Sequence, residues 1–398
     1  MTNSSPSSAR KGGERLRSFR WRSLASAFAV GLIAGCGPSD GVQELADGRA
    51  AFERADYKRA EKLLTKSAEC NPASVDACVL LAQLKMTGGD IPAAKEWISR
   101  AEDLAAGDTD VRLLGAQIAW HANDYEKAER LFAGIAEDAE LTPEIRSQGW
   151  TGLGIVQVTR NEHDLARVSY LRALRLDRRN ASARYHLGHL YRYAPFGYPE
   201  AALEQFDAFV HLAGAELSSV RVQKTQQKII PELRETVNRA ATERPGVAQR
   251  NSATSAAAIS KAEAAMKKGN YKAARIAYQE ALTADPLSYP AALGLAQTEL
   301  KADASVAGQR KALEAYRTAC SLKPSAVKTL IEAGQLAERL ASYVQAREIY
   351  SRAVAANPAS LDAIDGLIRS IRKANGDRKI AQAYQGYRDI LPVPGKRK

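Results

Sequence analysis

Histidines and cysteines are the side chains that could do chemistry in this chain, and they are few. The 398 residues contain five histidines and four cysteines. His186 and His189 stand three positions apart, so on a helix they would share one face and could in principle hold a metal ion together. No cysteine or carboxylate cluster accompanies them in the sequence. We therefore expect them to be groove or surface histidines, and we predict no metal site.

The sequence also lacks the common catalytic motifs. It contains no glycine-rich phosphate loop, no H-E-x-x-H, no paired C-x-x-C and no G-x-S-x-G. We predict that the protein is not an enzyme and uses no cofactor. An enzyme with a site assembled from distant parts of the chain is the least favoured alternative, and a closed pocket of titratable groups with strongly shifted pKa values would reveal it.

Small residues recur along the chain and predict the elements that would position any site. Successive copies are 34 to 38 residues apart, except for one step of 72, and an aromatic or aliphatic residue follows each copy four positions later. This spacing predicts pairs of short helices whose backbones approach closely. The second small residue of each copy, the second anchor, is Ala60, Ala94, Ala128, Ala166, Ala202, Ala274, Ala312 and Ala346, with Ile380 as a degenerate ninth. The preceding position, the first anchor, is Gly48, Ala82, Ala116, Gly154, Gly188, Ala262, Ala296 and Gly334, with Ile368 in the last copy.

This pattern resembles the tetratricopeptide repeat, whose period is about 34 residues and whose units begin W-x2-L-G-x2-Y and often close with proline. The fullest matches to that opening are Trp150, Leu153 and Gly154, and then Leu187, Gly188 and Tyr191. Closing prolines stand at Pro72, Pro286, Pro324, Pro358 and Pro392. The resemblance implies an all-α, right-handed superhelical solenoid of about nine helix-turn-helix repeats in two blocks. It also implies a function in binding proteins or peptides.

The double-length step divides the chain. We expect a first block over 41–215 with repeats 1 to 5 and a second block over 254–392 with repeats 6 to 9, followed by a basic tail over 393–398. Residues 216–253 are expected to be a helical bridge and polar linker that could let the blocks reorient. The expected helices there run from about 217 to 229 and from about 232 to 241, on either side of Pro231. A hidden degenerate repeat is the alternative.

The first forty residues have the composition of an export signal. Six basic residues precede an apolar run over 24–35, which ends in Ile33-Ala34-Gly35-Cys36. The end of this run resembles the lipobox of bacterial lipoproteins, which implies a signal peptide over 1–35, acylation of Cys36 and a lipidated tether over 36–40. The alternatives are a plain signal peptide and an uncleaved anchor, although about a dozen apolar residues are few for a spanning helix. Gly37 favours the outer membrane over the inner one by the same resemblance.

Export bears on the other cysteines. Cys70 and Cys78 end one expected helix and begin the next, so an oxidising compartment would allow a disulfide between them. Two buried free thiols are the alternative. Cys320 lies beside Ala319 on an apolar stripe and is expected in the core. Residues 1–35 carry a net charge of +5, so removing them lowers the net charge of the chain from +12 to +7, a balance that suits anionic lipid, polysaccharide or acidic partners but is no evidence for nucleic acid.

The resemblance places a partner-binding groove along the first helix of each repeat. The groove is expected to be apolar and aromatic in the first block and basic in the second. Large side chains that also carry a polar group suit peptide binding, although Phe52, Met86 and Trp120 could equally pack between repeats, and the last basic group could be a solvated end face. The expected groove residues are Phe52, Met86, Trp120, Tyr185, His189, Arg192, Tyr193, Lys267, Lys301, Arg339, Arg369, Arg372 and Lys373. The lysine and asparagine clamp that some family members use for terminal carboxylates is absent.

Together these features predict a lipid-anchored scaffold of the bacterial cell envelope, at the periplasmic face of the outer membrane. By resemblance to lipoproteins with such repeats, it would hold protein partners during assembly of a secretion, pilus, outer-membrane or exopolysaccharide-export complex. An accessory that binds anionic polysaccharide or peptidoglycan through the basic second block is the alternative.

Overall fold

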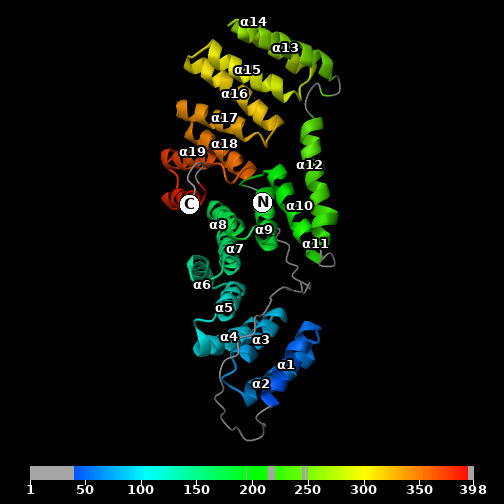
Figure 1. The fold of residues 1–398 in the computed structure, drawn as a ribbon, viewed down its shortest axis with the longest axis vertical. Helices are drawn as coiled ribbons and strands as arrows, with labels where there is room; N and C mark the ends of the chain where they lie inside the picture. The colour runs from blue at the N-terminus through cyan, green and yellow to red at the C-terminus, as the bar shows by residue number, and fades with distance from the viewer. Residues whose placement is uncertain (1–39, 194, 214–219, 244–246, 248–249, 393–398) are drawn as a thin grey trace, which may run out of the picture. The chain divides into compact units, whose positions relative to one another are not determined.

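The regular elements that the structure describes are all helical. The computed structural model describes residues 40–193, 195–213, 220–243, 247 and 250–392, and in these ranges it contains helices and no strand (Figure 1). Helices that follow one another in sequence pack together as pairs. The predicted all-α solenoid of helix pairs is therefore confirmed.

Two compact units make up the chain. The first contains the described residues of 40–161, 173–180 and 220–223, and the second contains those of 162–172, 181–213 and 224–392. The second unit thus includes part of the fourth repeat and most of the fifth, which the sequence groups with the first block. The contacts that join those repeats to the C-terminal helices are described below.

The first unit begins with three complete helix pairs and the first helix of a fourth. Their bounds are α1 Asp40–Glu53, α2 Tyr57–Cys70, α3 Val75–Thr87, α4 Ile91–Ala105, α5 Thr109–His121, α6 Tyr125–Glu137 and α7 Pro143–Thr159. The next helix, α8 (His163–Leu176), begins in the second unit and ends in the first.

The second unit continues with α9 (Ala181–Arg192) and α10 (Pro199–Leu212) and ends with four helix pairs (Figure 1). The bounds of those pairs are α13 Ser252–Lys267, α14 Tyr271–Ala284, α15 Tyr289–Ala302, α16 Val306–Leu322, α17 Val327–Arg339, α18 Tyr343–Ala356, α19 Leu361–Lys373 and α20 Arg378–Asp389.

Similar turns join the two helices of several pairs. In the pair α5 and α6, Asn123 has a φ of 60° and reverses the chain, and the Asp124 side chain accepts a hydrogen bond from the backbone N–H of Lys127 at 3.0 Å. Gly269, with a φ of 70°, and Asn270 do the same before α14. Left-handed backbone followed by a capping carboxylate or amide ends one helix and starts the next within a few residues.

Anchor residues bring the helices close together, as the repeat predicts. The second anchors from Ala60 to Ala346 are all fully buried. A Cβ atom built on Gly366 of α19 would lie 2.3 Å from the ring of Tyr350, and one built on Gly334 of α17 would lie 2.7 Å from it. The Tyr350 ring of α18 thus fills the space between two first helices, and this packing leaves no room for a methyl group.

Between α10 and α13 in the sequence, the chain forms one uninterrupted helical stretch. The sequence predicts two helices with a break between them. The observed stretch consists of α11 (Val220–Lys224), the π-helical turn η2 (Thr225–Ile229) and α12 (Ile230–Thr242). The N–H of Ile230 donates to the carbonyl of Thr225, the five-residue spacing of a π turn. Pro231 follows in the first turn of α12, where its missing N–H matters least. The expected break at Pro231 is therefore replaced by a local widening of the helix.

The disulfide that the sequence allows between Cys70 and Cys78 is not formed, because Cys78 is a free and buried thiol. Cys78 packs with Val79 and Ala82 in the apolar core around α3, whereas the Cβ of Cys70 lies near Gly41 of α1, 3.1 Å from where a Cβ on that glycine would be. Cys320 is buried and free, as expected for a core residue.

Candidate functional site

Three aromatic side chains form a column along one face of α9. The ring centroids of Tyr185 and His189 are 4.5 Å apart, and those of His189 and Tyr193 are 6.3 Å apart with nearly parallel planes. Phe206 and Phe209 of α10 support the inner end of the column, where Tyr185 and His189 are half-buried. Tyr193, just beyond the end of α9, is 56% exposed. The column therefore presents one aromatic ring to solvent on a rigid base.

Arg192 is held beside this column. Its guanidinium carbon lies 5.1 Å from the centroid of the Tyr193 ring, and its side chain forms an ion pair with Glu232 of α12. Such contacts fix the orientation of an arginine and of the aromatic ring below it. The structure thus brings together the four predicted residues of this repeat.

The predicted groove residues of the first unit differ in exposure. Met86 is buried in the core between α3 and α5, so it packs between repeats and is not open to a partner. Phe52 is half-buried against the neighbouring core, with its ring centroid 5.9 Å from that of Tyr57. Trp120 is also half-buried, and its indole N–H donates to the Thr159 hydroxyl at 3.2 Å. Phe52 and Trp120 each keep part of their surface open.

The predicted basic residues of the second unit are all exposed. They are Lys267, Lys301, Arg339, Arg369, Arg372 and Lys373. Arg369 differs from the rest because it makes two hydrogen bonds to the carboxylate of Glu338, at 3.2 and 3.1 Å. This carboxylate raises the pKa of Arg369, so the arginine is partly neutralised within the protein.

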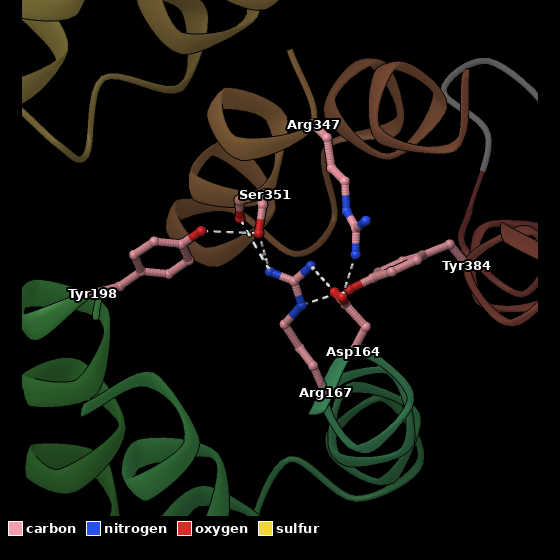
Figure 2. A network of polar contacts seen from close by, with 6 residues as sticks. All are labelled: Asp164, Arg167, Tyr198, Arg347, Ser351 and Tyr384. Carbon is pink, nitrogen blue, oxygen red and sulfur yellow. Dashed lines mark hydrogen bonds and ion pairs between the residues drawn. The ribbon is translucent and has the colours of Figure 1, made fainter. Parts of the chain in front are cut away.

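A buried arginine of α8 forms a polar cluster that the sequence did not reveal. The side chain of Arg167 is completely buried and points between α18 and α20 (Figure 2). Its Nε donates to the hydroxyl of Tyr384, and its Nη1 donates to the hydroxyl of Ser351 at 2.7 Å. Its Nη2 bonds to Asp164 at 3.2 Å. The bonds to Ser351 and Tyr384 join positions 184 and 217 residues apart in the sequence.

Three further residues complete this cluster, which we call the Arg167 cluster. Arg347 of α18 donates to the second carboxylate oxygen of Asp164 at 2.7 Å, and Tyr198 donates to the Ser351 hydroxyl at 3.0 Å (Figure 2). The ring of Phe196 lies 4.5 Å from the guanidinium carbon of Arg167. Phe196 and Tyr198 belong to the loop between α9 and α10, where the repeat carries extra residues. Phe196 therefore packs against Arg167, and Tyr198 contacts α18.

The cluster is electrostatically suited to hold charge in the protein interior. Burial acts to lower the pKa of Arg167, but Tyr384 and Asp164 raise it, and the net pKa lies above the ordinary value. Burial raises the pKa of the Tyr384 phenol well above its usual range. The guanidinium therefore stays charged and the phenol stays protonated at neutral pH. The arrangement is a structural contact that joins α8 and the loop before α10 to α18 and α20.

Sequence reasoning missed Arg167 because its position is usually polar. It directly follows the anchor Ala166, and the equivalent positions include Glu61, Lys95 and Arg347. Such residues look like the solvated face of a second helix. Only the contact with helices of a distant repeat buries Arg167, and the periodic pattern carries no signal for that contact. In the sequence, the next repeat carries extra residues over 194–198, between its two helices.

The described residues also bear on metals and membranes. Within them, no group of three or more histidine, cysteine or acidic side chains could hold a metal ion. The described helices include none that is long and apolar enough to cross a membrane. Cys36, the predicted lipidation site, lies outside the described residues.

Comparisons with known proteins identify the repeats. Family models described as tetratricopeptide repeat match residues 51–118 and 247–306. No curated protein matches the chain at a significant level.

Similar solved structures include PilF of Pseudomonas aeruginosa, which is 16% identical, with a TM-score of 0.37 over 66% of this chain and 98% of its own. TTC0263, a thermophilic TPR protein of Thermus thermophilus, is 18% identical, with a TM-score of 0.41 over 47% of this chain and 99% of its own. MamA of Desulfovibrio magneticus RS-1 is 13% identical, with a TM-score of 0.38 over 47% of this chain and 98% of its own. Likenesses of this size carry no functional argument.

Proposed function

Because this chain is a tetratricopeptide-repeat protein, and therefore a protein-interaction scaffold, we propose that it holds protein partners at the bacterial cell envelope. In this proposal Cys36 is acylated and confines the protein to the periplasmic face of the outer membrane. The tether raises the local concentration of the repeats around an assembling secretion, pilus, outer-membrane or export complex.

The observation that carries the binding part of the proposal is the aromatic column of α9. An exposed tyrosine on a rigid aromatic base can bury a large area on binding and loses little conformational freedom. Tyr193 is exposed, while His189 and Arg192 hold it from below and beside. The column thus has the properties expected of a contact point for a partner.

Photo-crosslinking in cells tests this part. A photoreactive phenylalanine analogue in place of Tyr193 or Trp120 is expected to capture a discrete partner protein. The same analogue in place of Val344, which is 74% exposed on α18, is the control. Capture from Val344 but from neither aromatic position would contradict the proposed binding face.

The anchor is tested separately, because a scaffold could bind partners without a lipid. Radiolabelled fatty acid is expected to enter the wild-type chain and not the Cys36→Ala variant. Equal labelling of the two chains would exclude acylation at this residue.

A further inference from the structure

Four basic side chains occupy one register position in four consecutive repeats of the second unit. Each lies five residues after the first anchor of its repeat, in the last turn of the first helix, and each is exposed. We call these residues, Lys267, Lys301, Arg339 and Lys373, the cation row. One register position shared by consecutive repeats forms a line along a solenoid.

Hydrogen bonds place successive first helices of the second unit next to one another. The Thr298 hydroxyl of α15 donates to the sulfur of Met266 of α13 at 3.1 Å, and Arg369 of α19 bonds to Glu338 of α17. Met266 and Glu338 each directly precede a member of the row. At the opposite ends of α15 and α17 from the row, the hydroxyls of Tyr289 and Thr329 lie 2.7 Å apart and join the two helices. Helices in contact lie about 10 Å apart, so the row extends over roughly 30 Å.

Helix-end electrostatics alone does not explain the row. A cation in the last turn of a helix is favoured by the partial negative charge of the terminal carbonyl groups. This argument applies equally to the first unit, yet the equivalent positions there are Glu53, Thr87, His121 and Thr159. The basic residues are therefore specific to the second unit.

The row retains its charge within the protein. Lys267, Lys301 and Arg339 form no ion pair with any described residue. The nearby carboxylates of Glu299 and Glu338 are already paired with Arg275 and Arg369.

Lys373, the fourth member of the row, is also charged and exposed, and one nearby glutamate lowers the net charge of the row. Lys373 lies over the Tyr343 ring at 5.2 Å and remains exposed. Glu263, one turn before Lys267 on α13, reduces the four positive charges of the row to a net +3.

We propose that the cation row binds an extended, acidic segment of a partner protein, which deepens the proposed scaffold function and rests on it. In the extended polyproline II conformation a chain rises about 3.1 Å per residue with three residues per turn, so acidic side chains at every third position lie on one face about 9 Å apart, close to the spacing of the row. A sugar polymer fits less well, because sugars commonly stack on open aromatic rings. From Ser252 to Pro392, the exposed large apolar residues include no aromatic side chain.

Peptide binding to the purified full chain in detergent tests the proposal. The probe is a fluorescein-labelled peptide of about 12 residues with glutamate at every third position, long enough to extend over the row. Anisotropy is expected to show saturable binding that weakens as salt rises. The triple variant Lys267→Glu, Lys301→Glu and Arg339→Glu should raise the Kd by about tenfold or more, as expected for three exposed charge contacts.

A matched variant controls for net charge. Lys272→Glu, Arg310→Glu and Arg317→Glu change the same total charge at exposed positions of α14 and α16, and they should leave the Kd within about threefold. Equal weakening by both variants, or binding of polygalacturonate but not of the peptide, would overturn the proposal. Neither result changes what photo-crosslinking from Tyr193 would show. Failure of the proposed binding by the cation row is therefore distinguishable from failure of the proposed scaffold function.

Discussion

Arg167 carries a charged guanidinium in a completely buried position, where charged groups are rare. Removing a guanidinium from water costs several kcal/mol unless hydrogen bonds and an opposite charge replace the lost hydration. Here Tyr384, Ser351 and Asp164 accept its N–H groups, and Phe196 covers the plane of the guanidinium. The cost is thereby offset, and the arginine fixes α8 against α18 and α20.

The Arg167→Met substitution should lower the free energy of unfolding by about 3 kcal/mol, because it leaves buried polar partners unsatisfied. Urea denaturation measures the loss, and amide hydrogen exchange in α20 should locate it. Arg234→Met removes an ion pair with Asp207 in which both side chains are about half exposed. It should cost less than about 1 kcal/mol. Equal losses in the two variants would contradict a structural role for the buried arginine.

Neighbouring helices pack closely around the ring of Tyr350. Tyr350 is completely buried, and the glycines at 334 and 366 leave room for its ring on both sides. Its hydroxyl donates to Glu338 at 3.0 Å, which holds the ring in place. A bulkier residue at either glycine could not be accommodated by a small rotation of the ring.

Two glycine-to-alanine substitutions should therefore change the free energy of unfolding in opposite directions. Gly366→Ala gains helix propensity of about 1 kcal/mol, but the new Cβ would lie 2.3 Å from the Tyr350 ring. The net effect should be destabilising by about 1–2 kcal/mol. In Gly134→Ala the nearest atom is 3.5 Å away, on the end of the flexible Arg112 side chain. That variant should be stabilised by up to about 1 kcal/mol. Urea denaturation of both variants checks the signs, and stabilisation by Gly366→Ala would disprove the packing argument.

The sequence predicts the parts of the fold that each repeat specifies for itself. The anchors from Ala60 to Ala346 are all buried because small residues are required wherever two helix backbones meet. The π turn before Pro231 was missed because a proline after an apolar pair also suits a helix break. The Arg167 cluster was missed because it depends on contact between repeats far apart in sequence. In the candidate site, the sequence does not decide whether Met86 packs between repeats or lines the groove, because a large apolar residue suits both positions.

At the scale of the whole molecule, the second unit departs from the usual behaviour of repeat arrays. In a solenoid, each repeat normally contacts only its neighbours. Within this unit, residues of α8 and of the loop before α10 contact α18 and α20 directly. Lys379 of α20 also approaches Glu162 at 3.6 Å. The unit is therefore joined through non-neighbouring repeats, and it should unfold more cooperatively than an open array.

Alkaline pH should unfold the protein, because burial raises the pKa of several tyrosine phenols in the core. They include Tyr170, Tyr191, Tyr316, Tyr350 and Tyr384. Above about pH 10 the unfolded chain loses protons that the folded chain retains, so the free energy of unfolding falls as pH rises. Each such phenol contributes about 1.4 kcal/mol per pH unit to the slope.

Spectrophotometric titration of tyrosinate, followed together with circular dichroism, measures this dependence. The buried phenols should ionise only as helical structure is lost. Tyr170→Phe removes one of these phenols, whose pKa is raised by burial alone. In this variant the fall of the free energy of unfolding with pH should be shallower by about 1.4 kcal/mol per pH unit. Full ionisation with the helices intact would refute the prediction.

The contact of α8 with α18 and α20 also restricts how this chain can evolve. An open array can gain or lose a unit by duplication or deletion of one gene segment, since each end remains free. In the second unit, adding or removing one helix pair between α13 and α18 would shift Ser351 and Tyr384 away from Arg167. A viable length variant would need a compensating change in the same event. The contacts of Arg167 thus constrain the repeat number of this unit, in the way that closure constrains the blade number of a propeller.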